Sequence, residues 1–459
     1  MTIPTYAGLG TALSGLEAMQ AGIDTTSENI SNSSNPNYSR QRVNLVDNPS
    51  LTMFTGAGNN PGVEIGTGVA IQSITRDDNQ FVDGQYWTAN ASSSYYSTLS
   101  NQLSNTEGDL NTSATTGLQS ALTGFYSTWE SLSTNPSLGS SVVEAGQTLT
   151  QQLNAASQQI STLQSQAGAQ LSTLTSDTGD LHQYATDVAQ LNVQIAAQNA
   201  SGLSSNSLQD QRAQILDKLS GLVNIQVQQQ TNGSDTINLM SSTGATITPP
   251  LVNGGTPPTV PDPSTAVPPS LSTAFGSDWT TVGGTIGALA QLADTTPGDP
   301  NAPLQQMQSE LDTVAQKVAG LVNGAVNPTP PGTATDFFSP STGITAASIA
   351  VNPSMTPATL AGLPSTADSA VYATQTSAVN DLSAFVSQVG NSVAQVSDSS
   401  TTASSLLTNL SNQRQSVSGV SLDEEMTNLI TFQQGYQASA RVMNTMQTVI
   451  QSLLTSVGG

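Results

Sequence analysis

Both ends of the chain carry apolar residues at alternating spacings of three and four, which is the pattern of a helix that buries a narrow seam against other helices. Near the start, this N-terminal seam consists of Leu9, Leu13, Leu16, Ile23 and Ile30. Near the end, the C-terminal seam consists of Leu422, Met426, Leu429, Tyr436, Ala440, Met443, Ile450 and Leu454. The sequence therefore predicts a long helix at each end, and each helix needs a partner.

The two seams have compatible lengths, so the simplest arrangement pairs the terminal helices side by side. An unpaired seam leaves apolar surface in water at a cost of about 25 cal/mol per Å². Two helices make only a thin core, so residual apolar surface would face other copies of the protein. In the alternative arrangement both ends pack into an ordinary globular core, which is the commoner outcome of such spacing.

Apolar stripes of the same kind recur through the middle of the chain and predict a mainly helical fold. They run from Tyr96 to Leu110, Leu118 to Leu132, Leu149 to Leu174, Leu181 to Ile195, Ile215 to Leu222, Leu304 to Leu321 and Val379 to Val396. From Val43 to Ile74, β-branched pieces separated by glycines indicate extended segments. From Ile225 to Ala302, apolar and polar residues alternate and a stretch rich in Pro, Gly and Thr follows, which indicates a β-rich insertion.

The expected domain organisation has three parts. Residues 1–35 with 420–459 form a terminal helical polymerisation domain, whose paired helices make a coiled-coil-like end. Residues 36–224 with 303–419 form a bundle of long helices with extended segments. Residues 225–302 form a small β-rich insertion that faces outward. The expected fold class is therefore mainly α.

Composition excludes several classes of partner. The chain has 8 lysines and arginines against 31 aspartates and glutamates, which gives a formal net charge of -23. Nucleic-acid binding needs a concentrated basic stripe, so we expect no nucleic-acid partner. No apolar run approaches the length of about 18 residues that crosses a membrane, so we expect no membrane partner. Cysteine is absent, which rules out disulfides and thiolate metal sites.

The residues offer little for catalysis or for binding a cofactor or metal. His182 is the only histidine, and its polar helical surroundings indicate a solvated side chain. Asp77 and Asp78 lack the spaced oxygen ligands of a calcium loop. We find no phosphate-binding glycine loop, zinc spacing or nucleophile elbow. The sequence therefore predicts a protein that is not an enzyme and has no catalytic, cofactor-binding or metal site.

Strings of residues at both ends resemble the terminal signatures of the flagellar rod, hook and hook-associated proteins. These strings are Ala12–Leu16, Glu28–Asn32 and Asn35–Gln41 near the start, and Gly419–Met426 and Phe432–Val442 near the end. The strings Tyr38–Gln41, Leu422–Glu425 and Leu208–Leu216 are most similar to the hook-associated branch at the hook–filament junction. The family usually carries glycine where this chain has Asn37, a residue that also tolerates a left-handed backbone.

The resemblance implies a structural subunit of the bacterial flagellum that polymerises through its terminal helices into a ring at the distal end of the hook. It also implies export through the flagellar type III channel with a flagellar export chaperone, and hence a secreted protein of the extracellular flagellum. The implied partners are other copies in the ring, hook subunits below, and a second junction protein and flagellin above. The seam residues from Leu9 to Ile450, with Tyr38 and Arg40, are then the expected assembly interface.

Two other interpretations stay open at the level of the sequence. A flagellar hook or distal-rod subunit shares the terminal strings but assembles into a long tube instead of a short ring. A secreted adhesin or hydrolase could carry its activity on the insertion at residues 225–302. Binding of sugar or peptide by that isolated segment would distinguish this second interpretation.

Overall fold

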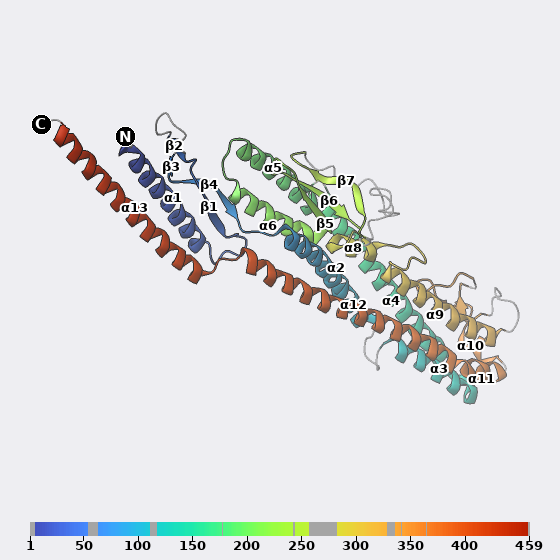
Figure 1. The fold of residues 1–459 in the computed structure, drawn as a ribbon. Coiled ribbons are helices and arrows are strands. Elements are labelled where there is room, and N and C mark those ends of the chain that lie inside the picture. The colour runs from blue at the N-terminus through green and yellow to red at the C-terminus, as the bar shows by residue number, and fades with distance from the viewer. Residues whose placement is uncertain are drawn as a thin grey trace.

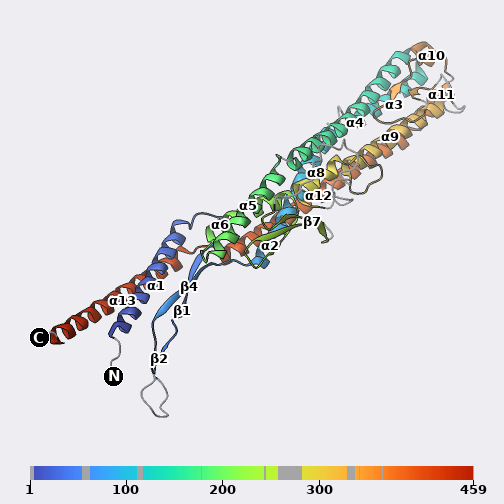
Figure 2. The ribbon, with the colours of Figure 1, turned by 90° about the horizontal axis from the view of Figure 1, so that it is seen from above.

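The computed structural model describes residues 5–53, 63–110, 117–176, 178–241, 244–256, 282–327, 336–340, 342–363 and 365–457. The molecule is elongated, and the two terminal helices extend with a hairpin from one end of a body of long helices (Figures 1 and 2). The helices are α1 (Thr5–Ser31), α2 (Gln80–Leu110), α3 (Leu118–Thr134), α4 (Gly139–Thr175), α5 (Asp180–Ala200), α6 (Asn206–Leu222), α8 (Gly284–Ala293), α9 (Pro303–Val326), α10 (Pro357–Ala361), α11 (Ser365–Ala373), α12 (Gln375–Ser418) and α13 (Leu422–Val457). The strands are β1 (Gln41–Asp47), β2 (Leu51–Met53), β3 (Val63–Ile65), β4 (Val69–Arg76), β5 (Ile225–Gln229), β6 (Asp235–Met240), β7 (Thr246–Asn253), β8 (Phe338–Ser339) and β9 (Ala350–Val351).

One continuous apolar core runs between the helices of the body. At the end far from the termini, Phe125 and Trp129 of α3 pack on Phe337, with ring centroids 5.5 and 5.4 Å apart. The predicted stripes supply most of this core, and the predicted mainly helical fold is confirmed. Within the described residues, we find no helix that combines the length and the apolar character needed to cross a membrane.

Helices α8, α10 and α11 lie outside the predicted stripes, and α12 is longer than predicted. α12 has 44 residues and packs along α2, whereas the sequence predicted only the part up to Val396. Its second half is rich in Ser and Thr, and Ala403 is its one buried residue, so no apolar stripe marks it. α8 was missed because most of its residues are buried, with contacts to α2 and α4, and a helix that is apolar on nearly every side shows no periodicity.

A hairpin joins the body to the terminal helices. β1 and β4 pair antiparallel, with Gln41 opposite Arg76 and Asp47 opposite Val69, and β2 and β3 pair beyond them. This confirms the extended segments predicted between Val43 and Ile74. The hairpin contacts α1 along β1 and β4, so it braces the N-terminal helix from one side.

A second sheet lies on the body, in the order β5-β6-β7 (Figure 1). Its strands are antiparallel, with Ile225 opposite Leu239, and Ile237 and Val252 are fully buried in the core shared with the helices. The segment predicted as a β-rich insertion therefore contains this sheet and also helix α8. The division of the chain into three domains stays a prediction, because residues 257–281 of the insertion lie outside the described residues.

Candidate assembly interface

The terminal helices α1 and α13 lie side by side and run antiparallel (Figure 1). Gly8, near the start of α1, faces Met446, whereas Gly22, further along α1, faces Phe432. A Cβ atom at Gly22 would lie only 2.6 Å from the Phe432 ring. The predicted pairing of the two ends is confirmed, and it depends on glycines that let side chains of one helix touch the backbone of the other.

The line along which the helices touch differs from the predicted seam, which corrects the sequence-based interpretation. The residues of α13 that face the glycines and Met19 of α1 are Phe432, Gly435, Ser439 and Met446. Each of Tyr436 and Ala440 follows a contact residue, and one residue is about 100° around a helix. On α1 the contact residues Gly8, Gly15 and Gly22 recur every seventh position. This regular spacing of glycines could have predicted the observed line of contact from the sequence.

The predicted seam residues instead lie to one side of the line of contact, and Met443 and Ile450, four residues after Ser439 and Met446, are displaced from it by only about 40°. On both helices they are displaced from the line of contact in the same rotational sense, and antiparallel helices bring such stripes to the same side. The exposed members are Leu13, Leu422, Met426, Tyr436 and Leu454, and the half-buried members are Leu9, Leu16, Ile23, Ile30, Leu429, Ala440, Met443 and Ile450.

We call this surface the apolar face and define it by four aliphatic residues that are about half exposed, namely Leu13, Leu422, Met426 and Ile430, the last of which lies one turn beyond Met426. Their exposed fractions are 48, 51, 49 and 51%. Scattered apolar residues are normal on a protein surface, but a row of them on two adjoining helices is not.

The hairpin covers the other side of α1. Ser14 lies against Gly68, and its hydroxyl accepts a hydrogen bond from the Val69 amide at 3.4 Å. Ala18 and Thr25 of α1 are buried on the same side. The hairpin thus protects one side of the pair and leaves the apolar face open.

The joint between the terminal helices and the body is polar and buried. We define the joint by Asn29, Tyr38, Arg40, Gln41 and Glu425. The Asn29 amide donates to the Gln41 carbonyl at 2.9 Å and to Glu425 at 3.0 Å, and its oxygen accepts from the Tyr38 hydroxyl at 2.8 Å and the Gln41 amide at 2.9 Å. Burial, together with nearby Glu28, raises the pKa of Tyr38, so the phenol stays neutral and remains a donor.

Arg40 completes the joint from the chain segment between α1 and β1. Its Nη1 atom lies 2.9 Å from Glu424, and its Nε atom lies 2.8 Å from Glu425 as an ion pair that is off the line of a good hydrogen bond. Its amide donates to the Ser418 carbonyl at 2.9 Å. Tyr38 and Arg40, predicted for contacts between subunits, therefore have partners within their own chain.

Two further arginines fasten the joint to the body. Arg76 of β4 lies 2.8 Å from Asp210 of α6. Arg414, near the end of α12, lies 2.8 Å from Asp83 and 2.7 Å from Asp217. Burial raises the pKa of Asp217, and Arg414 opposes this rise. These pairs could not be predicted from the sequence, since the partners are far apart along the chain.

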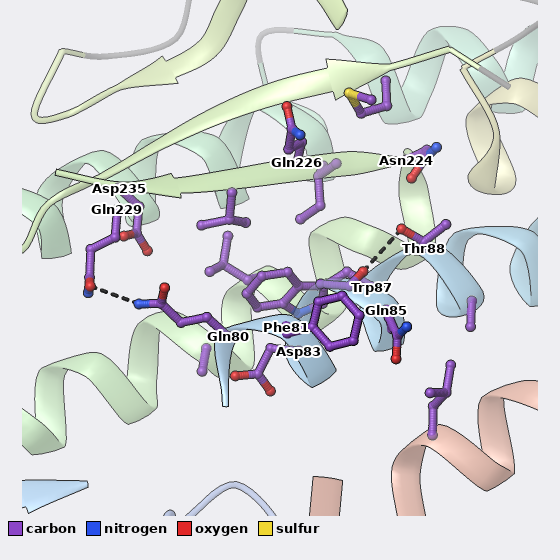
Figure 3. A pocket seen from close by; sticks show the side chains of 18 of the residues that line it. Gln80, Phe81, Asp83, Gln85, Trp87, Thr88, Asn224, Gln226, Gln229 and Asp235 are labelled. Carbon is purple, nitrogen blue, oxygen red and sulfur yellow. Dashed lines mark hydrogen bonds between the residues drawn. The ribbon is translucent and has the colours of Figure 1, made fainter. Parts of the chain in front are cut away.

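A cleft of about 910 Å³ lies on the body between α2, α6, α12 and strand β5 (Figure 3). Phe81 stands in it with 73% of its surface exposed, and Gln80 and Gln229 are joined across it by a hydrogen bond of 2.8 Å. Its carboxylates Asp78, Asp83 and Asp235 are already paired with arginines. Among its described lining residues we find no arrangement of an unpaired base beside a nucleophile.

The other residues considered for chemistry lie apart from this cleft. His182 is half-buried on α5 and does not line it. Asp77 accepts from Arg42 at 3.1 Å. Within the described part of the chain, no three His, Asp or Glu side chains are grouped to hold a metal ion.

Two family models match the chain. The model described as the flagellar hook-associated protein FlgK helical domain matches residues 103–327. The model described as the flagellar basal body rod FlgEFG protein C-terminal matches residues 411–456, which include the end of α12 and nearly all of α13.

Relatives match over nearly the whole chain. Flagellar hook-associated protein 1 of Bacillus subtilis strain 168 is 28% identical, and the match covers 99% of each chain. Flagellar hook-associated protein 1 of Escherichia coli K12 is 24% identical, and the match covers 97% of this chain and 99% of the relative. Among solved structures, the flagellar hook junction protein FlgK from Burkholderia pseudomallei is 25% identical with a TM-score of 0.42, over 57% of this chain and 46% of that one.

Proposed function

The chain belongs to the flagellar hook-associated protein family, and on this premise we propose that it is a structural, non-enzymatic subunit of the ring that joins hook to filament. Hook subunits lie below this ring, and a second junction protein and flagellin lie above it. The chain reaches the site unfolded through the flagellar export channel with the help of an export chaperone, and it acts outside the cell. The full-length relatives, which carry the name of hook-associated protein, favour this role over that of a hook or distal-rod subunit.

The observation that carries this proposal is the apolar face of the terminal pair. The contact between α1 and α13 is made in large part at glycines, which carry no apolar side chain of their own, and the hairpin covers the other side of α1. Leu422, Met426 and Ile430 remain about half exposed in a single copy. Such a row is stabilised by burial against other copies, which makes it a polymerisation surface.

The experiment replaces Met426 and Ile430 together by aspartate in the flagellated cell. Both residues are exposed, so the purified variant should unfold at nearly the wild-type temperature. Buried carboxylates in a subunit contact are strongly unfavourable, so the ring should not form and flagellin should be lost to the medium. Immunogold labelling of intact flagella with the wild-type chain should show a short band between hook and filament.

A matched control replaces Thr427 and Thr431 by aspartate. These residues have the same spacing on the same helix and are also exposed, but each follows Met426 or Ile430 by one residue and so points about 100° away from the apolar face. Filaments should stay attached in this control. Attachment in the Met426→Asp, Ile430→Asp variant, or label along the whole hook, would contradict the proposal.

A further inference from the structure

Arg441 differs from every other basic side chain in the part of the chain that the structure describes. The ion pairs there engage Arg40, Arg42, Arg76, Arg212, Lys317 and Arg414. Lys218 lies over the Tyr184 ring, 5.9 Å from its centroid. Arg441 is exposed on α13 and has no acidic or aromatic partner among the described residues. The chain has a net charge of -23, so acidic side chains are abundant, yet none of those described in the same copy pairs with Arg441.

Arg441 points away from α1. It follows Ser439, which touches Gly15 of α1, by two residues, and two residues turn a helix by about 200°. Figure 1 shows α13 at the edge of the molecule, with no other element on its far side. Arg441 therefore lies on a surface that is open to a neighbouring molecule.

The outer surface of α1 carries the opposite charge. Glu17, Asp24 and Glu28 are exposed there, and none of them forms an ion pair with another described residue. Glu17 follows the contact residue Gly15 by two residues, so it points away from α13 by the same argument. Asp24 is held by a hydrogen bond of 2.8 Å from Gln20, whereas Glu17 has no such bond among the described residues.

At the level of Glu17, one helix pair thus presents an acidic group on the outer side of α1 and a basic group on the outer side of α13. The exposed Asp423 lies on the same side of α13, but it is 18 residues from Arg441, or about 27 Å along the axis. Surfaces of this kind match between copies that stand side by side in the same orientation, and such head-to-tail contacts close into a ring when the rotation allows it. A copy in the reverse orientation would bring like charges together, which disfavours it.

We propose that Arg441 of one copy pairs with Glu17 of the next copy, so that the outer side of α13 docks on the outer side of α1. Gly15 and Ser439 lie at the same level along the axis of the pair, and Glu17 and Arg441 are each two residues beyond them in opposite directions. The positions of Glu17 and Arg441 along this axis therefore differ by about 6 Å, a distance that an arginine side chain spans. The inference rests on the proposed function, because it requires copies side by side in a ring. Beyond the proposed function, the inference specifies which surfaces of neighbouring copies touch and which copy supplies the acidic and which the basic side chain.

The test reverses each charge in the flagellated cell. Arg441→Glu and Glu17→Arg should each reduce the fraction of flagellin in attached filaments about tenfold, since each turns an attraction into a repulsion at every contact in the ring. The double variant restores an ion pair of opposite polarity, so attachment should return to within about twofold of wild type. Lys317→Glu, which changes the net charge equally on an exposed site of the body, should have no effect.

A cross-linking experiment places the contact directly, because the chain contains no cysteine. Intact flagella that carry Glu17→Cys and Arg441→Cys in the same chain should give covalent oligomers with a short bismaleimide, whereas the purified monomer should not. Harmless charge reversals, or a double variant no better than the worse single variant, would overturn the inference. If labelling shows the wild-type chain at the junction in that case, the proposed function stands and the Arg441–Glu17 pair alone is wrong.

Discussion

A chain with alanine in place of Asp235 should lose about 3–5 kcal/mol of unfolding free energy, which is the usual cost of breaking a buried ion pair. Asp235 begins strand β6, and its carboxylate lies 2.9 Å from Arg212 of α6. Both side chains are about 95% buried, with exposed fractions of 5 and 6%. Arg212 also donates to Asn192 at 2.7 Å and to the Gly233 carbonyl at 2.8 Å, so its charge would stay buried without a counter-ion.

Urea unfolding of the purified monomer measures this loss. The double variant Asp235→Ala, Arg212→Met should be more stable than the single variant, because it removes the unpaired charge along with its partner. Asp381→Ala breaks the exposed Lys317 pair and should change the unfolding free energy by less than about 1 kcal/mol. An Asp235→Ala chain as stable as this control would show that the sheet is not fastened to α6 through Arg212.

The second large effect is expected at the joint, on replacing Glu425 by alanine. The Glu425 side chain is only 2% exposed, and its removal takes one hydrogen bond from Asn29 and the inner ion pair from Arg40. Because Arg40 is 19% exposed, water replaces part of this interaction, and we expect a loss of about 2–3 kcal/mol. The loss falls on the attachment of α13, not on the core of the body.

Hydrogen exchange at the first turns of α13 measures this local opening in the monomer. The neighbouring Glu424 is the matched control, because it also pairs with Arg40 but is 61% exposed. Glu424→Ala should therefore change the free energy of local opening, as measured by exchange, by less than about 1 kcal/mol. Equal effects of the two substitutions would contradict the account of the joint.

The sequence predicted the terminal helices well because their apolar spacing is regular over many turns. The predicted line of contact was wrong because it was based on the large apolar residues alone. The helices instead meet at Gly15, Gly22 and Gly435, which add nothing to an apolar stripe. The second half of α12 was missed for a related reason. Its helix is held by packing along α2 and not by an apolar stripe of its own.

The joint lay beyond prediction from one sequence. Asn29 and Glu425 are separated by 396 positions, and Arg40 and Glu424 by 384. Nothing in the composition or spacing of either segment identifies the partner.

The measurement that tests the central claim most directly compares the reactivity of a single thiol at Ile430→Cys in the purified monomer and in intact flagella. The native chain has no cysteine, and Ile430 is 51% exposed in one copy, so the monomer should react rapidly with a maleimide. In flagella, the neighbouring copies should bury this position and reduce its labelling rate strongly, while Lys317→Cys on the body should react equally in both states. Rapid labelling of Ile430→Cys in flagella that carry the chain at the junction would contradict the claim that the apolar face is the polymerisation surface.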